Sequence, residues 1–137
     1  MEPHFDLSDD QFEAQFRSLT FVPAHFSHEA HLRLAWIHIR KYGVDKAAEN
    51  IAEQILAFAN SLGESAIYNK TLTVAAVKAV NHFYLRSKTG NFKEFIDEFP
   101  QLKHEFKQLI GSHYSLDIFN SEEAKAEYLQ PDLIPFD

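Results

Sequence analysis

Apolar side chains recur every three or four residues along most of the chain, which is the spacing of one face of an α-helix. Phe12 and Phe16 show this spacing near the start, and Ile51 and Ile55 show it again later. The apolar run 74–80 could be a strand if it is taken alone, but it lacks the period of two that marks a half-buried strand. The pattern therefore predicts an all-α protein.

Capping and breaking residues divide this pattern into separate helices. Serine and asparagine residues suited to N-caps precede several periodic runs, and glycines follow them. Ser8 with Gln11, and Asn91 with Glu94, have the spacing of a capping box. The expected helices begin after Ser8 and after Asn91, and cover about 27–42, 45–61, 71–87, 100–110 and 121–129. Short connections favour antiparallel neighbours, so we expect one domain over 1–137, a bundle of six or seven helices.

Two segments have expected positions within this bundle. The helix at 71–87 is apolar on nearly all sides, which is typical of a central helix. The tail from Gln130 to Asp137 contains two prolines and cannot be helical throughout. Its apolar residues Leu133, Ile134 and Phe136 predict that it packs back on the body of the protein.

Composition and charge exclude several classes of function. The 137 residues are 45% hydrophobic and suit a globular domain, and the absence of cysteine excludes disulfides, thiolate metal sites, iron–sulfur clusters and thiol catalysis. A net charge of −7 without a basic cluster disfavours nucleic acid as a partner. No secretory signal is recognisable, and no apolar run approaches the roughly 18 residues that cross a bilayer. We expect a soluble cytoplasmic protein that does not bind a membrane.

No catalytic motif is present in the chain. There is no G-x-S-x-G elbow and no glycine-rich phosphate loop. Whether the protein is an enzyme therefore stays open.

Two histidines stand out in the segment "FSHEAHLRLAW". His28 and His31 share the helix face that carries Leu32, whereas Glu29 and Arg33 lie on the polar side. We expect both imidazoles to point into the bundle, where a polar ring needs a partner. Three interpretations remain open: structural histidines in the core, the first half of a metal site, or the wall of a pocket in which one histidine acts as acid or base.

The segment "YNKTLT" offers the polar groups that could meet these rings. Asn69 or Thr71 could act only as an N-cap of the helix that follows. Alternatively, this helix N-terminus binds a small polar or anionic ligand that faces the imidazoles. In that interpretation the ligand-binding residues are His28, His31, Tyr68, Asn69, Thr71 and Thr73.

A competing hypothesis is a non-catalytic interaction module with purely structural histidines. Leu34 and Ile37 lie away from the expected core face and could form the self-association patch of a homodimer. Of the other histidines, His38 could extend the polar edge of its helix. The remaining five are expected on loops or the surface: His4, His25, His82, His104 and His113.

Three segments resemble a family of small uncharacterised bacterial helical proteins, over the chain from Phe26 to its end. The family patterns are F-[ST]-H-x-x-H-L-x-x-A, Y-H-x-T-x-T and A-[RK]-x-x-[FY]-x-x-P-D-L. The first pattern is matched by Phe26, Ser27, His28, His31, Leu32 and Ala35. The last is matched by Ala124, Lys125, Tyr128, Pro131, Asp132 and Leu133.

The resemblance implies no activity, but it bears on metal binding. The middle pattern usually carries a third histidine, which would suit a site of three imidazoles. This chain has Asn69 at that position, followed by Lys70 where many relatives carry glutamate. Asparagine is a poor ligand for zinc or iron, and a nearby ammonium opposes cation binding. A divalent metal at His28 and His31 is therefore disfavoured, and the chain could be a degenerate relative of a metal-binding protein.

Overall fold

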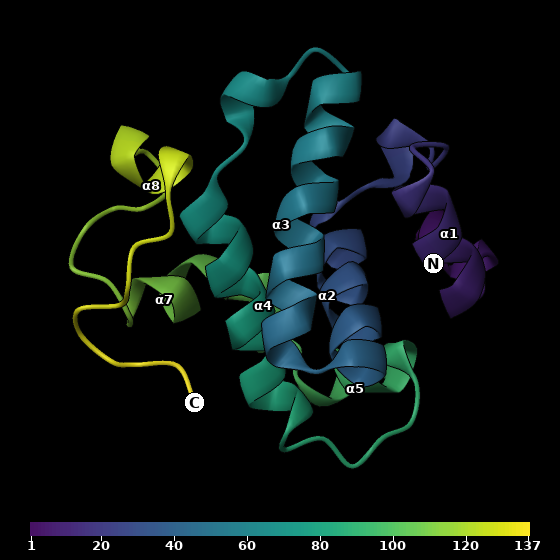
Figure 1. The fold of residues 1–137 in the computed structure, drawn as a ribbon. Coiled ribbons are helices and arrows are strands. Elements are labelled where there is room, and N and C mark those ends of the chain that lie inside the picture. The colour runs from purple at the N-terminus through teal and green to yellow at the C-terminus, as the bar shows by residue number, and fades with distance from the viewer.

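The computed structural model describes residues 1–137 and consists of helices joined by short loops (Figure 1). The long helices α2 (His28–Tyr42), α3 (Val44–Ser61) and α4 (Lys70–Tyr84) pack against one another at the centre. Helix α1 (Asp9–Arg17) lies on one side of these three, and the C-terminal helices α7 and α8 lie on the other. The prediction of an all-α bundle is confirmed.

The remaining elements are short. Eight α-helices and three 3-10 helices are present, against the six or seven helices expected. The expected helix at 100–110 is broken at Glu105, whose φ of −130° is not helical. The short elements are η1 (Pro3–Asp6), η2 (Pro23–His25), η3 (Ser65–Ile67), α5 (Phe92–Glu98), α6 (Gln101–His104), α7 (Phe106–Gly111) and α8 (Glu122–Ala126).

The helix starts follow the capping residues in the sequence. Ser8 and Gln11 form the complete capping box at α1, with N···O distances of 2.9 and 3.1 Å. Ser27 and Asn91 likewise accept backbone hydrogen bonds at the starts of α2 and α5. Gly43 joins α2 directly to α3 with a φ of 82°, a conformation that favours glycine. The N-caps are confirmed because caps satisfy the free N–H groups of a helix start within four residues, whereas the box expected at Asn91 lacks the return bond to the Glu94 side chain.

Two apolar clusters build the core, and α4 contributes to both. The larger cluster joins α1, α2, α3, α5 and α6 and is rich in phenylalanine, including the fully buried Phe12 and Phe95. Val77 and Val80 of α4 face this cluster, whereas Ala75 and Ala79 pack against the C-terminal segment in the smaller one. Burial on two sides explains why α4 is apolar nearly all round.

Helix α2 is more completely buried than its sequence pattern indicates. It contacts α1, α3, α4 and α6, so that Leu34 and Ile37 are only 0% and 1% exposed. The expectation that these two residues form an exposed self-association patch is wrong. A helix with neighbours on several sides has no free face for its remaining apolar residues.

The C-terminal tail lies back against the body, as predicted, and Phe136 is partly buried, but Leu133 and Ile134 remain 56% and 54% exposed. The Leu133 N–H donates to the His113 carbonyl at 3.0 Å, and the Phe136 ring stacks on the His113 ring. Helix α8 ends at Ala126 instead of continuing to 129, because the hydroxyl of Thr71 bonds the main chain of Glu127 and Leu129. None of the helices is both long and apolar enough to span a membrane.

Candidate functional site

A cavity of about 840 Å³ lies between α2, α3 and α4, is bordered by loops and is open to solvent on one side. Its volume lies within the range of about 300–1,000 Å³ typical of small-molecule sites. Fifteen of the 21 lining residues are hydrophobic, so the cavity is mainly apolar and not the polar pocket expected from the sequence. The polar lining residues are His28, His31, Glu64, Tyr68, Asn69 and Thr73.

The structure brings five of the six sequence-predicted ligand residues to this one cavity. The two histidines enter from the first turn of α2, where Ser27 caps the helix. Tyr68, Asn69 and Thr73 enter from the start of α4. Two segments about 40 residues apart in the sequence therefore meet because α2 and α4 pack side by side.

Thr71 is the predicted ligand residue that does not belong to the cavity. Its side chain is fully buried on another face of α4. The hydroxyl donates to the Glu127 carbonyl at 2.6 Å and accepts from the Leu129 N–H at 3.0 Å. The assignment of Thr71 to a ligand site is therefore a mistake, because this residue attaches the C-terminal segment to α4.

His28 and His31 line the cavity and are exposed to solvent, instead of pointing into the packed core as expected. His28 Nε2 lies 3.0 Å from the Leu102 carbonyl oxygen, and His31 Nδ1 lies 3.1 Å from that of Ser27. The His31 ring also stacks on Phe26, with ring centroids 3.8 Å apart. Both rings are thus held in fixed orientations.

These hydrogen bonds decide which nitrogen of each ring carries a proton. A carbonyl oxygen can only accept, so His28 Nε2 and His31 Nδ1 are the N–H groups. The other nitrogens, His28 Nδ1 and His31 Nε2, have no partner in the protein and present lone pairs when the rings are neutral.

The surroundings of His31 favour its neutral form. Enclosure by protein lowers the pKa of His31 to about 4; its hydrogen bond to Ser27 opposes this shift, and the nearby His28 reinforces it. Water in the cavity would hydrate the charged ring and weaken the shift, because the ring is exposed to that space. Even an ordinary histidine pKa of about 6.5 leaves an imidazole mostly neutral at pH 7.4.

The groups at the start of α4 are bonded to the main chain. Asn69 is the N-cap, accepting from the Leu72 N–H at 2.9 Å, and its amide nitrogen donates to the Ile118 carbonyl at 2.7 Å. The Tyr68 hydroxyl donates to the Ala52 carbonyl, and the Thr73 hydroxyl donates to the Asn69 carbonyl. Capping is therefore one role of Asn69, and its second bond connects α4 to the loop that carries the cavity residue Phe119.

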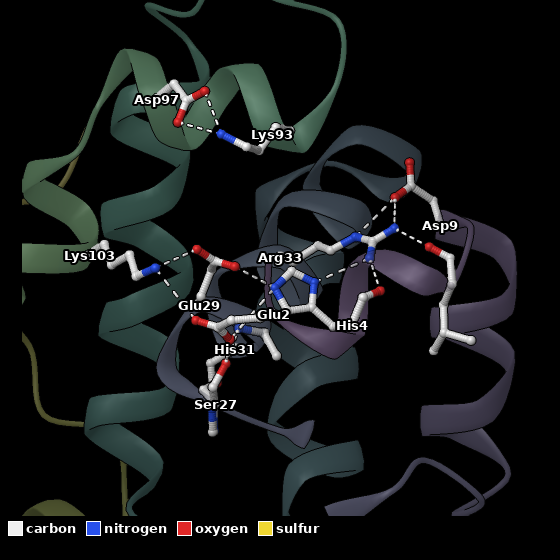
Figure 2. A network of polar contacts seen from close by, with 12 residues as sticks. Glu2, His4, Asp9, Ser27, Glu29, His31, Arg33, Lys93, Asp97 and Lys103 are labelled. Atoms are coloured by element: carbon white, nitrogen blue, oxygen red, sulfur yellow. Dashed lines mark hydrogen bonds and ion pairs between the residues drawn. The ribbon is translucent and has the colours of Figure 1, made fainter. Parts of the chain in front are cut away.

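A second polar arrangement lies at the N-terminal side of α2 (Figure 2). His4 is fully buried there, with its Nε2 atom 2.6 Å from Glu29 Oε1. Arg33 donates to the main-chain carbonyls of His4 and Leu7 and to the Asp9 carboxylate. The sequence-based placement of His4 on the surface is wrong, since the first residues of the chain cover the side of α2 that carries Glu29 and Arg33.

Lys103 completes this network from α6. Its ammonium lies 2.7 Å from Glu29 Oε2 and 3.5 Å from Glu2 Oε2. Burial alone would raise the pKa of Glu29, but hydrogen bonds from Lys103 and His4 outweigh burial and lower the pKa. The spacing of Glu29 and Arg33, four residues apart on one helix face, was the available signal for this network. It does not reveal that partners from residues 2–9 and 103 bury both side chains.

Glu2, His4 and Glu29 have the proximity expected of metal ligands, with donor atoms all within 4.8 Å of one another. His28 and His31 are not part of such a group. Arg33 Nη1 lies 3.3 Å from His4 Nδ1, and arginine can only donate, so the His4 proton resides on Nε2. Ligating histidines instead donate their second N–H to an acceptor. The cluster is therefore an ion-pair network whose cation is Lys103.

Neutral buried histidines predict how stability depends on pH. Burial lowers the pKa of His4 and of His38, which is also buried and not at a polar helix edge as expected. Below about pH 6.5 the unfolded chain binds protons that the folded chain does not, so stability falls as pH falls. We expect urea unfolding to show a loss of about 1–3 kcal/mol between pH 7 and pH 5.

The carboxylates do not account for this loss. Hydrogen bonds from Lys103 and His4 lower the pKa of Glu29 against the effect of burial. Glu29 therefore contributes to the pH dependence of stability mainly below pH 4.5, the ordinary pKa of a glutamate. The variant His38→Gln should lose less stability over the same pH interval than the unmodified protein. A constant free energy of unfolding from pH 7 to 5 would contradict the prediction.

The cavity and the N-terminal network differ in the space and the unpaired polar atoms that they offer to a ligand. Every charged group of the network already has a partner of opposite charge or a main-chain partner. The cavity has more open volume, about 840 Å³ against about 310 Å³ beside the network, and two unpartnered ring nitrogens, and it is the candidate site. Comparison with models of protein families, with curated proteins and with solved structures found no match for this chain.

Proposed function

We propose that this protein binds a small organic molecule with a mainly apolar body in the cavity between α2, α3 and α4. The single observation that carries the proposal is an apolar cavity of about 840 Å³ whose wall includes His28 and His31 with free ring nitrogens. Ligand sites typically combine an apolar pocket with a small number of polar groups at fixed positions.

The apolar surface that the cavity leaves uncovered supports a functional role. Folded proteins normally cover apolar surface by close packing, and an exposed apolar concavity is typical of a binding site. Ala35 and Ala76 line the cavity where larger residues on the same helices would fill it. The sequence therefore keeps this space open, as expected where a site must admit a ligand.

The rigidity of the walls favours a small ligand over a flexible partner. Three long helices supply most of the lining, and Phe26, Phe106 and Phe119 add aromatic surface from the loops and from α7. A metal is not part of the proposal, because His28 and His31 meet no third histidine, aspartate or glutamate at ligand distance and zinc normally has at least three protein ligands.

Binding of a neutral fluorescent probe tests the proposal. N-phenyl-1-naphthylamine should bind with a saturable rise in fluorescence and a stoichiometry of one. Ala76→Phe places a ring in the cavity from α4 and should weaken binding at least tenfold, on the order of 1.4 kcal/mol or more. Fluorescence titration of both proteins measures this difference.

Ala57→Phe is the matched control, because Ala57 is exposed on α3 and does not line the cavity. This variant should bind the probe as the unmodified protein does. Thermal unfolding should show that both variants are folded. Equal affinity in a folded Ala76→Phe variant, or the absence of saturable binding in the unmodified protein, would exclude the cavity as a ligand site.

A further inference from the structure

We infer that the polar group of the ligand is a hydrogen-bond donor, a hydroxyl or an amine, and not an anion. This inference rests on the proposed function and specifies the chemical class of the ligand. It follows from which polar atoms of the cavity wall are already hydrogen-bonded within the protein and which are free to bond a ligand.

The cavity wall contains no fixed positive charge. None of its lining residues is lysine or arginine, and Glu64 is its only acidic residue. The whole chain carries a net charge of −7. An anion entering the cavity would lose hydration without gaining an ion pair, and desolvation of an unpaired charge costs several kcal/mol.

The hydroxyl donors of the wall and one hydrogen of the Asn69 amide are directed to main-chain carbonyls. The Tyr68 hydroxyl donates to Ala52 at 3.1 Å, and the Thr73 hydroxyl donates to the Asn69 carbonyl at 2.8 Å. The Asn69 amide nitrogen donates to Ile118 at 2.7 Å, and the Asn69 side chain is buried. A hydroxyl that has given its proton to a carbonyl can only accept a further hydrogen bond from a ligand.

The two imidazoles are acceptors for the same reason. Leu102 holds the proton of His28 on Nε2, and Ser27 holds the proton of His31 on Nδ1. The nitrogens left without a partner are His28 Nδ1 and His31 Nε2, both with lone pairs. Enclosure by protein also lowers the pKa of His31, so this ring does not become a cationic donor at neutral pH.

The wall therefore offers several acceptors and no free cationic donor to the ligand. A hydroxyl or ammonium group can satisfy these acceptors, whereas a carboxylate or phosphate would face lone pairs. A donor that reaches a free ring nitrogen gains about 0.5–1.5 kcal/mol per neutral hydrogen bond, and more when the donor is charged.

Three probes of equal chain length test the inference: decanol, decylamine and decanoate. Each is titrated against bound N-phenyl-1-naphthylamine at pH 7.5. The alcohol and the protonated amine should displace the probe at concentrations at least tenfold lower than decanoate. If decanoate displaces the probe equally well or better, or if none of the three does, the inference fails while the proposed function stands. If the fluorescent probe itself does not bind, the proposed function fails.

Two histidine variants separate hydrogen bonding from attraction of an amine to an acidic surface. His31→Phe keeps an aromatic ring beside Phe26 but removes the acceptor, and it should reduce the preference for decanol over decanoate at least threefold. His104→Phe is the control, because His104 is exposed and lies outside the cavity. It should leave the preference unchanged. An unchanged preference in a folded His31→Phe variant would overturn the role of this ring as the acceptor.

Discussion

Leu34→Asp is expected to abolish the folded state at 25 °C. The Leu34 side chain is fully buried in the larger core cluster, between helices that contact α2 on several sides. The substitution removes a core side chain, at about 2–5 kcal/mol, and introduces a carboxylate with no partner. The sum is comparable with the 5–15 kcal/mol that stabilises a typical domain. Circular dichroism should show the loss of helical signal and of a cooperative thermal transition.

The matched control is Leu56→Asp, at an exposed position of α3. We expect this variant to remain folded, with a change in stability below about 1 kcal/mol. Comparing the two variants also shows whether Leu34 is a core residue or an interface residue. If Leu34→Asp stayed folded with an altered oligomeric state in size-exclusion chromatography, Leu34 would belong to an association surface and the burial described here would be wrong.

Arg33→Met is expected to lower the free energy of unfolding by about 3–5 kcal/mol, the range for breaking a buried ionic network by removing one partner. The Arg33 side chain is only 6% exposed and donates to the His4 and Leu7 carbonyls and to Asp9. Methionine keeps most of the volume but leaves these acceptors without a donor. Urea unfolding monitored by circular dichroism measures the difference.

Arg17→Met is the control for Arg33→Met, because Arg17 is exposed at the end of α1. Its effect should stay below about 1 kcal/mol. Arg33→Lys should recover only part of the lost stability, since an ammonium cannot reproduce the planar fork that serves several acceptors. A loss smaller than about 1 kcal/mol in Arg33→Met would show that the network is solvated and contributes little.

The network and the cavity are connected through α6. Glu29 binds the ammonium of Lys103, and His28 donates to the carbonyl of the preceding residue, Leu102. Adjacent positions of α2 therefore hold adjacent positions of α6. Because the Leu102 carbonyl fixes the tautomer of His28, the ion pair that holds α6 also supports the hydrogen-bonding pattern of the cavity.

The sequence alone determined the long helices and their boundaries to within a few residues, although it did not predict the break at Glu105 or the three 3-10 helices. Ser8, Ser27 and Asn91 marked helix starts, and Gly43 marked the junction of α2 with α3. These features depend on hydrogen bonds and backbone conformations within about one turn of helix, so the local residues are sufficient to predict them. The sequence also predicted that His28 and His31 would lie near the segment at Tyr68, and both line the same cavity. The expected contact between them is absent, because the two rings bond main-chain carbonyls elsewhere.

Only the tertiary structure decided which faces are buried and which side chains meet. A helix pattern assumes one buried face, but α2 has neighbours on several sides, so Leu34 and Arg33 are both buried. His4 is buried by contact with Glu29 and Arg33. These partners lie more than 20 residues away in the chain, so the residues next to His4 do not predict its burial. Thr71 and Thr73 are two residues apart and point to different surroundings, the C-terminal segment and the cavity. Such long-range packing depends on how the helices fit together, and residue spacing within a single helix does not specify it.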